Sequence, residues 1–478
     1  MYDFDLVVIG SGPAGEKGAA QAAYFGKRVA VIEREAAPGG AAVHTGTLPS
    51  KTLRETALFL AGHRQRELYG VGVNVEPEIA VQRMLVRKDA VRDREVERIR
   101  WNLERHGIQL IRGAARLMNG HAVEVRGESG SRMLTAEFIL VATGSVPRRP
   151  DDVDFDDPAI DDSDSILHIE HLPRRMVILG GGVIGCEYAS IFAELGVEVT
   201  LVDSRPALLP FLDSDIAEGL TRAMRESGVT LLFDSIPEFI GRAEGGEMLV
   251  RLVNGRELSA DHVLVTSGRI GAVEGLGLAD ARVEVSPRGH VRVDADFRTN
   301  VSSVFAAGDV IGNPALASTS MEQGRVAVCH AFGFEYKRDV SSLLPYGIYA
   351  IPEVGTVGLT EVAAREAGFD VVAGRAPYGQ NARGQIIGAA QGEVKLVFDR
   401  QTCRLLGTHV IGDLATELVH IGQVVMALNG TGQTLIDMVF NYPTLSECYK
   451  YAAYDALGKM GDVRMHGHAP ALAGGASV

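Results

Sequence analysis

A strand, a glycine-rich turn, a helix and a second strand follow one another twice in this chain, and this repeat limits the possible folds most. The first copy is "DLVVIGSGPAGEKGAAQAAYFGKRVAVIER" (5–34) and the second is "RRMVILGGGVIGCEYASIFAELGVEVTLVDSR" (174–205). Each turn has the spacing G-x-G-x-x-G, and an acidic residue ends each second strand. The glycines are Gly10, Gly12 and Gly15 in the first copy and Gly180, Gly182 and Gly185 in the second, and the acids are Glu33 and Asp203.

The spacing of these glycines suits a dinucleotide. The first glycine permits a tight turn, the second lets the backbone approach a pyrophosphate, and the third lets the helix pack against the strand. The start of the helix then offers free N–H groups and the positive end of its dipole to the phosphates. The acid accepts hydrogen bonds from ribose hydroxyls. Two such units predict two dinucleotides, and a flavin beside a nicotinamide is the pair that hydride transfer requires.

Composition narrows the class of protein. With 478 residues, the chain is long enough for about three domains, and its hydrophobic fraction of 46% predicts a globular protein with a large core. The net charge of −14 argues against nucleic acid or an anionic membrane as a partner. No apolar run is long enough to span a bilayer. The first residues lack a basic n-region, so we expect no signal peptide and a cytoplasmic location.

The cysteines predict neither a metal site nor a disulfide scaffold, because they show no C-x-x-C spacing and no paired framework. We interpret them as small buried apolar residues in a reducing compartment. They are Cys186, Cys329, Cys403 and Cys448.

Three further segments carry motifs: "PGGAAVHTGTLPSKTL" (38–53), "FILVATGSVPRRP" (138–150) and "NVSSVFAAGDVIGNPALASTSMEQGRVA" (300–327). They resemble the redox-active, ATG and GD segments of the flavoprotein disulfide reductases, the FAD-dependent pyridine nucleotide-disulfide oxidoreductase family. The resemblance covers nearly the whole chain. It implies an α/β fold with two Rossmann-like dinucleotide-binding domains and a C-terminal α+β dimerisation domain.

The implied domains are a discontinuous FAD-binding domain (1–150 and 275–340), an NAD(P)-binding domain (151–274), an interface domain (341–460) and a flexible tail (461–478). Within the first domain, the charged stretch 81–107 carries apolar residues on one helical face, which predicts an amphipathic helix whose charges are solvated. The apolar residues are Val96, Ile99 and Leu103.

The resemblance also assigns residues to the cofactors. Asp309 would hold the ribityl chain of FAD, and Gly308 would allow close backbone approach. The residues expected to contact FAD or a nicotinamide nucleotide are Gly10, Gly12, Gly15, Glu33, Arg34, Gly40, Ala42, Lys51, Ala115, Gly144, Gly308, Asp309, Ala317, Gly180, Gly182, Gly185, Asp203, Arg205, Gly268 and Arg269.

The chain departs from the family at its sulfur chemistry. The two cysteines of the redox-active segment are replaced by Ala42 and Thr47, which can neither attack a disulfide nor close one. The family's His-Pro-Thr-x-x-Glu segment is here "YPTLSE", with Tyr442 in place of the histidine and Glu447 retained. Tyrosine, with a reference pKa near 10, is a poor proton shuttle at neutral pH. These losses predict a flavin enzyme that works without a redox disulfide.

The remaining catalytic residues follow from the resemblance. Lys51 would lie beside the flavin and pair with Glu187, and Thr47 would cover the flavin face where a sulfur normally sits. A cation near the ring stabilises the anionic reduced flavin. His44 has two interpretations, a structural histidine or a catalytic one. The predicted catalytic set is Lys51, Glu187, Thr47, Tyr442 and Glu447.

Within the family, the likeness is strongest to the soluble pyridine nucleotide transhydrogenases. It rests on "HTGTLPSKTLR" (44–54), "DVDFDDPAIDDSDSIL" (152–167), "GVIGCEYASIF" (182–192) and "FNYPTLSE" (440–447). The implied reaction is NADPH + NAD⁺ ⇌ NADP⁺ + NADH, in ping-pong fashion through FAD. Those transhydrogenases keep the first cysteine, whereas this chain has Ala42.

Two other functions stay open. Cysteine-free flavoproteins with NAD(P)H:quinone reductase activity also carry "GGAAV", so quinones are an alternative acceptor. A non-catalytic flavin-binding subunit is the third hypothesis. For the nucleotide pocket, Asp203 favours NAD, while Arg205 either neutralises Asp203, binds a 2′-phosphate or is a plain surface residue. The segment with Glu447 implies a homodimer or a larger homo-oligomer.

Overall fold

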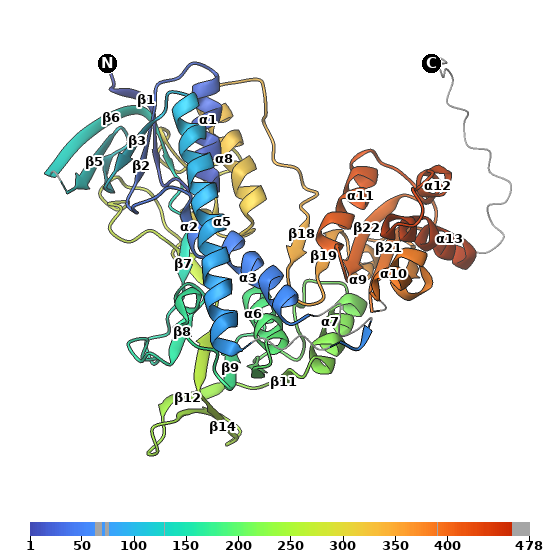
Figure 1. Cartoon of the computed structure of the whole chain (residues 1–478). Coiled ribbons are helices and arrows are strands. Elements are labelled where there is room, and N and C mark those ends of the chain that lie inside the picture. The colour runs from blue at the N-terminus through green and yellow to red at the C-terminus, as the bar shows by residue number, and fades with distance from the viewer. Residues whose placement is uncertain (63–68, 72–75, 129, 390, 461–478) are drawn as a thin grey trace, which may run out of the picture. The chain divides into compact units, whose positions relative to one another are not determined.

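The computed structural model describes residues 1–62, 69–71, 76–128, 130–389 and 391–460 (Figure 1). The tail predicted at 461–478 lies outside the described residues. Two compact units are present. The first unit contains Met1–Leu209, Met224–Leu344 and Tyr349–Ile351, and the second contains Pro210–Ala223, Pro345–Ile348 and the described residues from Pro352 on. The domain boundaries expected from the sequence stay a prediction.

The first repeat forms a parallel sheet in the order β3-β2-β1-β6, with β17 pairing β6 on its other side. The first half of β6 instead pairs antiparallel with β5, which pairs with β4. The parallel strands are apolar runs because both of their faces are covered. The strands are β1 (Phe4–Ile9), β2 (Val29–Glu33), β3 (Gln109–Arg112), β4 (Ala114–Asn119), β5 (Ala122–Gly127), β6 (Gly130–Val141) and β17 (Val304–Ala306).

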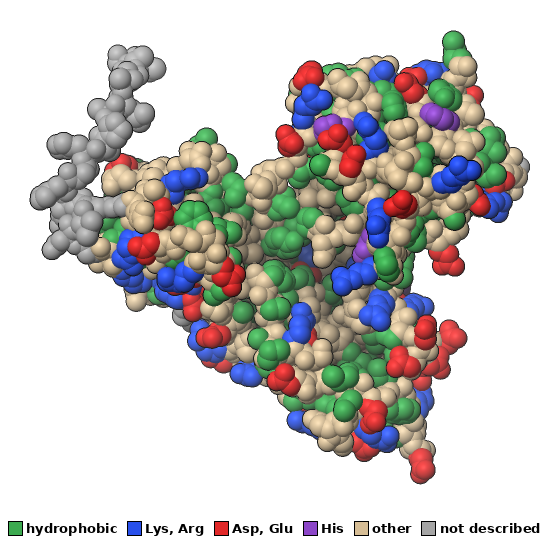
Figure 2. Space-filling view, turned by 180° about the vertical axis from the view of Figure 1, so that it is seen from behind, with side chains coloured by type: hydrophobic (Ala, Val, Ile, Leu, Met, Phe, Trp, Pro, Cys, Tyr) green, Lys and Arg blue, Asp and Glu red, His purple; other side chains and the backbone are tan. Residues whose placement is uncertain are grey.

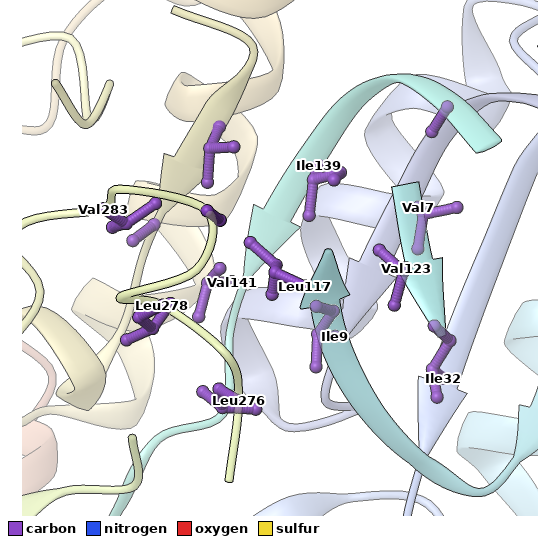
Figure 3. Packing of buried hydrophobic residues seen from close by; sticks show 14 of the residues in the cluster. Val7, Ile9, Ile32, Leu117, Val123, Ile139, Val141, Leu276, Leu278 and Val283 are labelled. Atoms are coloured by element: carbon purple, nitrogen blue, oxygen red, sulfur yellow. The ribbon is translucent and has the colours of Figure 1, made fainter. Parts of the chain in front are cut away.

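A segment that follows the second repeat in the sequence completes the hydrophobic core against this sheet. Figure 3 shows Leu276, Leu278 and Val283 beside Val141 and Ile9, all members of one buried apolar cluster. The burial of this apolar surface joins a late segment to the first sheet, across the whole second repeat.

Helices cover the first sheet. The helix of the first repeat, α1, packs against α8, and Figure 1 shows α5 beside them. The helices of this part are α1 (Pro13–Tyr24), α2 (Gly40–His44), α3 (Thr47–Leu60), α5 (Pro77–Arg105) and α8 (Ala317–Phe332), with a short 3₁₀ turn, η2 (Asp309–Ile311).

Helix α5 confirms one expectation and corrects another. Val96, Ile99 and Leu103 are buried on one face, as their periodicity predicts. The expectation that all charges of this stretch are solvated is wrong for Lys88, which is 6% exposed. Its ammonium donates a 2.7 Å hydrogen bond to the Leu167 carbonyl, and burial lowers the pKa of Lys88. The hydrogen bond makes this burial tolerable.

The second repeat forms a second parallel sheet in the order β11-β10-β9-β15-β8. Helix α6 packs on β9 and β10, and an antiparallel sheet of β12, β13 and β14 is attached. A separate ribbon pairs β7 with β16. In chain order, the elements from β7 to β16 are β7 (Ser145–Pro147), β8 (Ile160–Asp162), η1 (Ser165–His168), β9 (Arg175–Leu179), α6 (Val183–Glu194), β10 (Glu198–Val202), α7 (Ser214–Glu226), β11 (Thr230–Leu232), β12 (Pro237–Arg242), β13 (Met248–Leu252), β14 (Glu257–Ala260), β15 (His262–Val265) and β16 (Arg269–Gly271). Most of α7 belongs to the second unit.

Both glycine turns depend on a contact that only glycine allows. A Cβ atom at Gly15 would lie 1.9 Å from the carbonyl oxygen of Gly10, and a Cβ atom at Gly185 would lie 1.9 Å from that of Gly180. Gly10 and Gly180 have φ of +99° and +110°, which side chains disfavour. The helix therefore begins directly against the end of the strand.

The second unit holds an antiparallel sheet in the order β18-β19-β22-β21-β20, with α11 and α13 packed on it. These sheets and helices agree with the predicted α/β class. The elements are β18 (Tyr346–Ile348), β19 (Val354–Gly358), α9 (Glu361–Glu366), β20 (Val371–Pro377), η3 (Tyr378–Gln380), α10 (Ala382–Ile387), β21 (Glu393–Asp399), β22 (Leu405–Ile411), α11 (Ala415–Ala427), α12 (Gly432–Asp437), η4 (Leu445–Glu447) and α13 (Cys448–Met460).

A fully buried lysine lies in this unit. The Lys395 ammonium, on β21, is 2.6 Å from a carboxylate oxygen of Asp213 and also pairs with Asp215 and Glu361. Lys395 is 0% exposed and Asp213 is 1% exposed. Burial raises the pKa of Asp213, but the hydrogen bonds from Lys395 and the Glu361 N–H and the nearby positive charge together outweigh burial, so the pKa lies below its usual value. Each charge is tolerated because the other is present.

Charge is mixed on the surface. On the face drawn in Figure 2, basic and acidic side chains alternate, so the net charge of −14 is not gathered there into one patch. Within the described ranges, none of the helices is both long and apolar enough to cross a bilayer.

We expect Gly185→Ala to lower the melting temperature much more than Gly182→Ala. The first Cβ atom would meet the Gly180 carbonyl, at a cost of about 3 kcal/mol for a forced backbone shift. The second would meet no atom within 4 Å, and as a helix N-cap it costs at most about 1 kcal/mol. Circular dichroism during heating measures both. Equal melting temperatures would contradict the packing argument.

We expect Lys395→Met to lower the free energy of unfolding by about 3–5 kcal/mol, because Asp213 then keeps a buried charge without its cationic partner. The loss should be largest near neutral pH. It should shrink as the pH falls towards and below 3.8, the ordinary pKa of an aspartate, because the buried Asp213 of the variant then takes up a proton. Urea unfolding across pH measures it. Lys459→Met is the control, since Lys459 is 48% exposed beside Asp455, and it should cost under about 1 kcal/mol. Equal losses would refute the proposal of a buried pair.

Candidate active site

The first glycine turn is fixed by the acid that ends β2. Glu33 is 8% exposed, and its carboxylate accepts hydrogen bonds from the Ser11 N–H (3.0 Å) and the Ser11 hydroxyl. Its other oxygen accepts from the Glu35 N–H (2.9 Å). Gly12 starts α1 without a side-chain cap, so the first N–H groups of the helix remain available to an anion.

The segment at 38–53 begins against this turn. A Cβ atom at Gly40 would lie 2.8 Å from the Cα atom of Gly12, so α2 begins directly beside the turn. Ala42 is half-buried and Thr47, the first residue of α3, is exposed. His44 Nε2 lies 3.1 Å from the Pro38 carbonyl oxygen, a contact within the segment that favours the structural interpretation of this histidine.

One buried hydroxyl near this turn has no hydrogen-bond partner. Thr143 Oγ1 is buried and has no partner among the described residues, and the Thr143 Cα atom lies 3.2 Å from where a Gly10 Cβ atom would be. A buried polar group without a partner is costly, so the arrangement fits a ligand that supplies the missing hydrogen bond. The segment 138–150 was recognised from the sequence, but the Thr143 hydroxyl within it was not predicted to be functional.

Ser145 joins two residues that the sequence assigned to cofactors. Its hydroxyl donates a 2.9 Å hydrogen bond to Asp309 and accepts one of 2.9 Å from the Arg269 Nε–H. Arg269 also donates to the Ser145 carbonyl (2.9 Å) and to Asp164 (2.8 Å). Asp309 and Arg269 are therefore brought together, through a serine that was missed because its partners are distant in the chain.

The second glycine turn repeats the arrangement of the first. Asp203, which follows β10, is 4% exposed and accepts hydrogen bonds from the Gly181 N–H (2.5 Å) and the Arg205 N–H (2.8 Å). The Arg205 guanidinium also binds this carboxylate, with Nε at 2.9 Å, and is 40% exposed. Burial raises the pKa of Asp203, but the hydrogen bonds from Arg205 and Gly181 and the positive charge of Arg205 together outweigh burial, and the pKa is lower than usual.

Lys51 and Glu187 form an ion pair between α3 and α6. The ammonium lies 2.7 and 2.8 Å from the two carboxylate oxygens. Glu187 is 4% exposed, whereas 25% of the Lys51 side chain is exposed. The Glu187 carboxylate also accepts a 3.0 Å hydrogen bond from the Tyr349 N–H. A cation that is held in place yet still reaches the surface can act on a bound molecule.

The other predicted residues occupy varied positions. Arg34 is 62% exposed beside Glu35, and Ala115 is a half-buried residue of β4. Gly144 and Gly268 have φ of +71° and +99°, and a Cβ atom on either would meet nothing within 4 Å. Ala317 is the first residue of α8, and the Gly308 N–H donates to Gln323.

Tyr442 and Glu447 belong to the second unit, whereas the other predicted catalytic residues belong to the first. Tyr442 is 69% exposed and Glu447 is half-buried in η4. Further large apolar side chains near them in sequence are exposed: Met438 at 41%, Val439 at 95%, Tyr451 at 52% and Tyr454 at 47%. The cysteines are buried as expected, except Cys403, which is half-buried.

Known proteins resemble the chain over almost its full length. A soluble pyridine nucleotide transhydrogenase of Mycobacterium bovis (strain BCG / Pasteur 1173P2) is 44% identical over 462 residues, 96% of this chain and 98% of the relative. One of Chromohalobacter salexigens is 41% identical over 468 residues, 96% of this chain and 99% of the relative.

Solved structures are also similar to this chain over most of its length. LpdA from Mycobacterium tuberculosis has a TM-score of 0.87 at 28% identity, over 94% of this chain and 99% of that one. The HOCl-induced flavoprotein disulfide reductase RclA from Escherichia coli has a TM-score of 0.85 at 29% identity, over 94% of this chain and 99% of that one.

Family comparison covers both units. Residues 4–324 match the pyridine nucleotide-disulphide oxidoreductase family, and residues 344–453 match the dimerisation domain of the same family. Such a match implies flavin and nicotinamide nucleotides as cofactor and substrate. The chain belongs to the pyridine nucleotide-disulphide oxidoreductase family.

Proposed function

We propose that this protein is an FAD-dependent soluble NAD(P)⁺ transhydrogenase, which interconverts NADPH + NAD⁺ and NADP⁺ + NADH without a redox disulfide. One observation carries the proposal. Both glycine turns and the Lys51–Glu187 ion pair are intact, while Ala42 and Thr47 stand where the family has its cysteines. The machinery for hydride transfer is thus kept and that for sulfur transfer is lost. The names of the relatives, soluble pyridine nucleotide transhydrogenases, support the same reaction.

The first turn fits FAD. The free N–H groups at the start of α1 suit its pyrophosphate, Glu33 its ribose, and Asp309 its ribityl chain. The unpartnered Thr143 hydroxyl offers one more hydrogen bond. FAD, when bound, would supply the group that carries a hydride between the two nucleotides. Lys51 contributes a fixed positive charge to this site, and Glu187 holds that charge in position.

The second turn suits both nicotinamide nucleotides. Arg205 neutralises the carboxylate of Asp203, so the charge that would repel a 2′-phosphate is balanced. Arg205 is itself exposed enough to turn toward a phosphate. We therefore propose that NADH meets Asp203 at its ribose hydroxyls and that NADPH meets Arg205 at its phosphate.

The assembly and location are also proposals. The match to a dimerisation domain and the exposed apolar side chains around Tyr442 support a homodimer in which Glu447 serves the partner's site. The cytoplasmic location and the domain boundaries at 150, 274 and 340 stay as the sequence predicts them.

The test is purified protein mixed with NADPH and thio-NAD⁺, with and without a quinone. We expect fast thio-NADH formation that needs no quinone, and no reduction of lipoamide or glutathione disulfide. In an anaerobic titration, one NADPH per flavin should complete the reduction without a thiolate-to-flavin charge-transfer band, because the segment has no sulfur. Uptake of a second reducing equivalent would contradict the disulfide-free proposal. Turnover only with the quinone would favour a quinone reductase.

We expect Arg205→Ala to weaken the use of NADPH selectively, and Asp203→Asn to improve it relative to NADH. Each change should alter the ratio of kcat/KM values about tenfold, equivalent to roughly 1–3 kcal/mol for a charge-assisted hydrogen bond. Half-reactions with each nucleotide at fixed ionic strength measure it. Arg251→Ala is the matched control, because Arg251 is 43% exposed and paired with Glu257. If Arg205→Ala affects both nucleotides equally, Arg205 has no part in the choice.

A further inference from the structure

A segment of three consecutive residues is hydrogen-bonded to both helices that carry the Lys51–Glu187 ion pair. Residues 349–351, here called the strap, follow β18 in the chain. The Tyr349 N–H donates to Glu187 (3.0 Å), the Ala350 carbonyl accepts from Arg54 Nε (3.0 Å), and the Ile351 N–H donates to the Ser190 hydroxyl (3.1 Å). Arg54 belongs to α3, and Glu187 and Ser190 belong to α6.

The anchoring side chains are themselves buried. Arg54 is 4% exposed and Ser190 is 2% exposed. The Ser190 hydroxyl itself donates a 2.9 Å hydrogen bond to the Glu187 carbonyl oxygen. Buried hydrogen bonds of this kind fix the position of a backbone segment, because breaking one leaves a polar group without a partner. The strap is therefore held firmly against the ion pair.

The strap brings an aromatic ring to the lysine. The Lys51 ammonium lies 5.0 Å from the centroid of the Tyr349 ring, within the range of a cation–π attraction. Its other neighbours are the Glu187 carboxylate at 2.7 Å and the Ser50 hydroxyl at 3.3 Å. The same tyrosine thus contacts both members of the pair, the acid through its backbone and the lysine through its ring.

We infer that Tyr349 is a positioning residue for Lys51. A lysine side chain has four flexible carbon–carbon links, so an ion pair alone leaves its ammonium several arrangements. The ring removes some of these arrangements, and the backbone N–H keeps the carboxylate oriented. The value of this for hydride transfer rests on the proposed function, in which Lys51 lies beside the flavin. Tyr349 was not among the residues that the sequence indicated.

Chemical labelling of Lys51 in the holoenzyme tests the positioning directly. Trace acetic anhydride, followed by mass spectrometry, measures the reaction rate of the Lys51 amine. We expect Tyr349→Leu to raise this rate roughly three- to tenfold, since the ring no longer restrains the ammonium. Tyr349→Phe keeps the aromatic ring, so its labelling rate should equal that of the wild type. An unchanged rate in Tyr349→Leu would overturn the inference.

A second series removes the charge attraction without changing the packing. Fluorinated phenylalanines at position 349, with one, two and three fluorines, weaken the ring's negative face step by step while its shape is nearly kept. We expect the labelling rate of Lys51 to rise with each fluorine. A rate that does not respond to fluorine would refute a cation–π contact, even if Tyr349→Leu does not fold. Trp101→Leu is the matched control, because this 57% exposed ring lies 4.4 Å from Arg105 and should leave Lys51 unaffected.

The flavin midpoint potential provides the readout that a packing role would not move. A displaced Lys51 stabilises the reduced flavin less, so the potential of Tyr349→Leu should become more negative, and Tyr349→Phe should restore it. If labelling changes but the potential does not, Tyr349 positions Lys51 as inferred, and the proposal that Lys51 acts on the flavin is wrong. The two measurements therefore separate failure of this inference from failure of the proposed function.

Discussion

The contact between the start of a helix and the end of the preceding strand is the constraint on which both dinucleotide units depend. Because Gly15 and Gly185 lack a Cβ atom, α1 and α6 begin against the carbonyl oxygens of Gly10 and Gly180. The acids at the ends of β2 and β10 then complete the turns by accepting loop N–H groups. On the proposed function these acids would have two tasks, because the carboxylates that would bind a ribose also hold the turn in shape.

Local pattern was sufficient for much of the molecule. The two glycine turns, the buried face of α5 and the partnership of Lys51 with Glu187 all follow from residues within one motif or from the family resemblance. The hydrogen bond of Lys88 to Leu167 does not, because periodicity describes one helix and its partner is 79 positions away. Tyr349 and Ser145 were missed for the same reason, as their partners lie more than a hundred positions away.

Two lysine–carboxylate groups in the chain show how exposure separates structure from chemistry. Lys395 is fully buried with several carboxylates around it, so its ammonium group interacts only with other groups of the protein. Lys51 has a single carboxylate partner among the described residues and keeps a quarter of its side chain exposed. Burying a charge is costly, and an incompletely surrounded ion pair adds little stability. The Lys51–Glu187 pair is present although Ala42 and Thr47 replace the family's two cysteines. A charge that acts on a ligand explains this pair better than stability does.

The charge balance at the second glycine turn also indicates groups arranged for a ligand. A transhydrogenase has to bind a nucleotide with a 2′-phosphate and one without it in the same pocket, so neither an uncompensated acid nor an uncompensated base suits it. Asp203 is buried and pairs with the partly exposed Arg205, which leaves no net charge on this pair. On the proposed function, a pocket that offers both hydrogen-bond acceptors and a cation would discriminate little between the two nucleotides. For an enzyme that has to exchange one nucleotide for the other, that lack of selectivity would be the useful property.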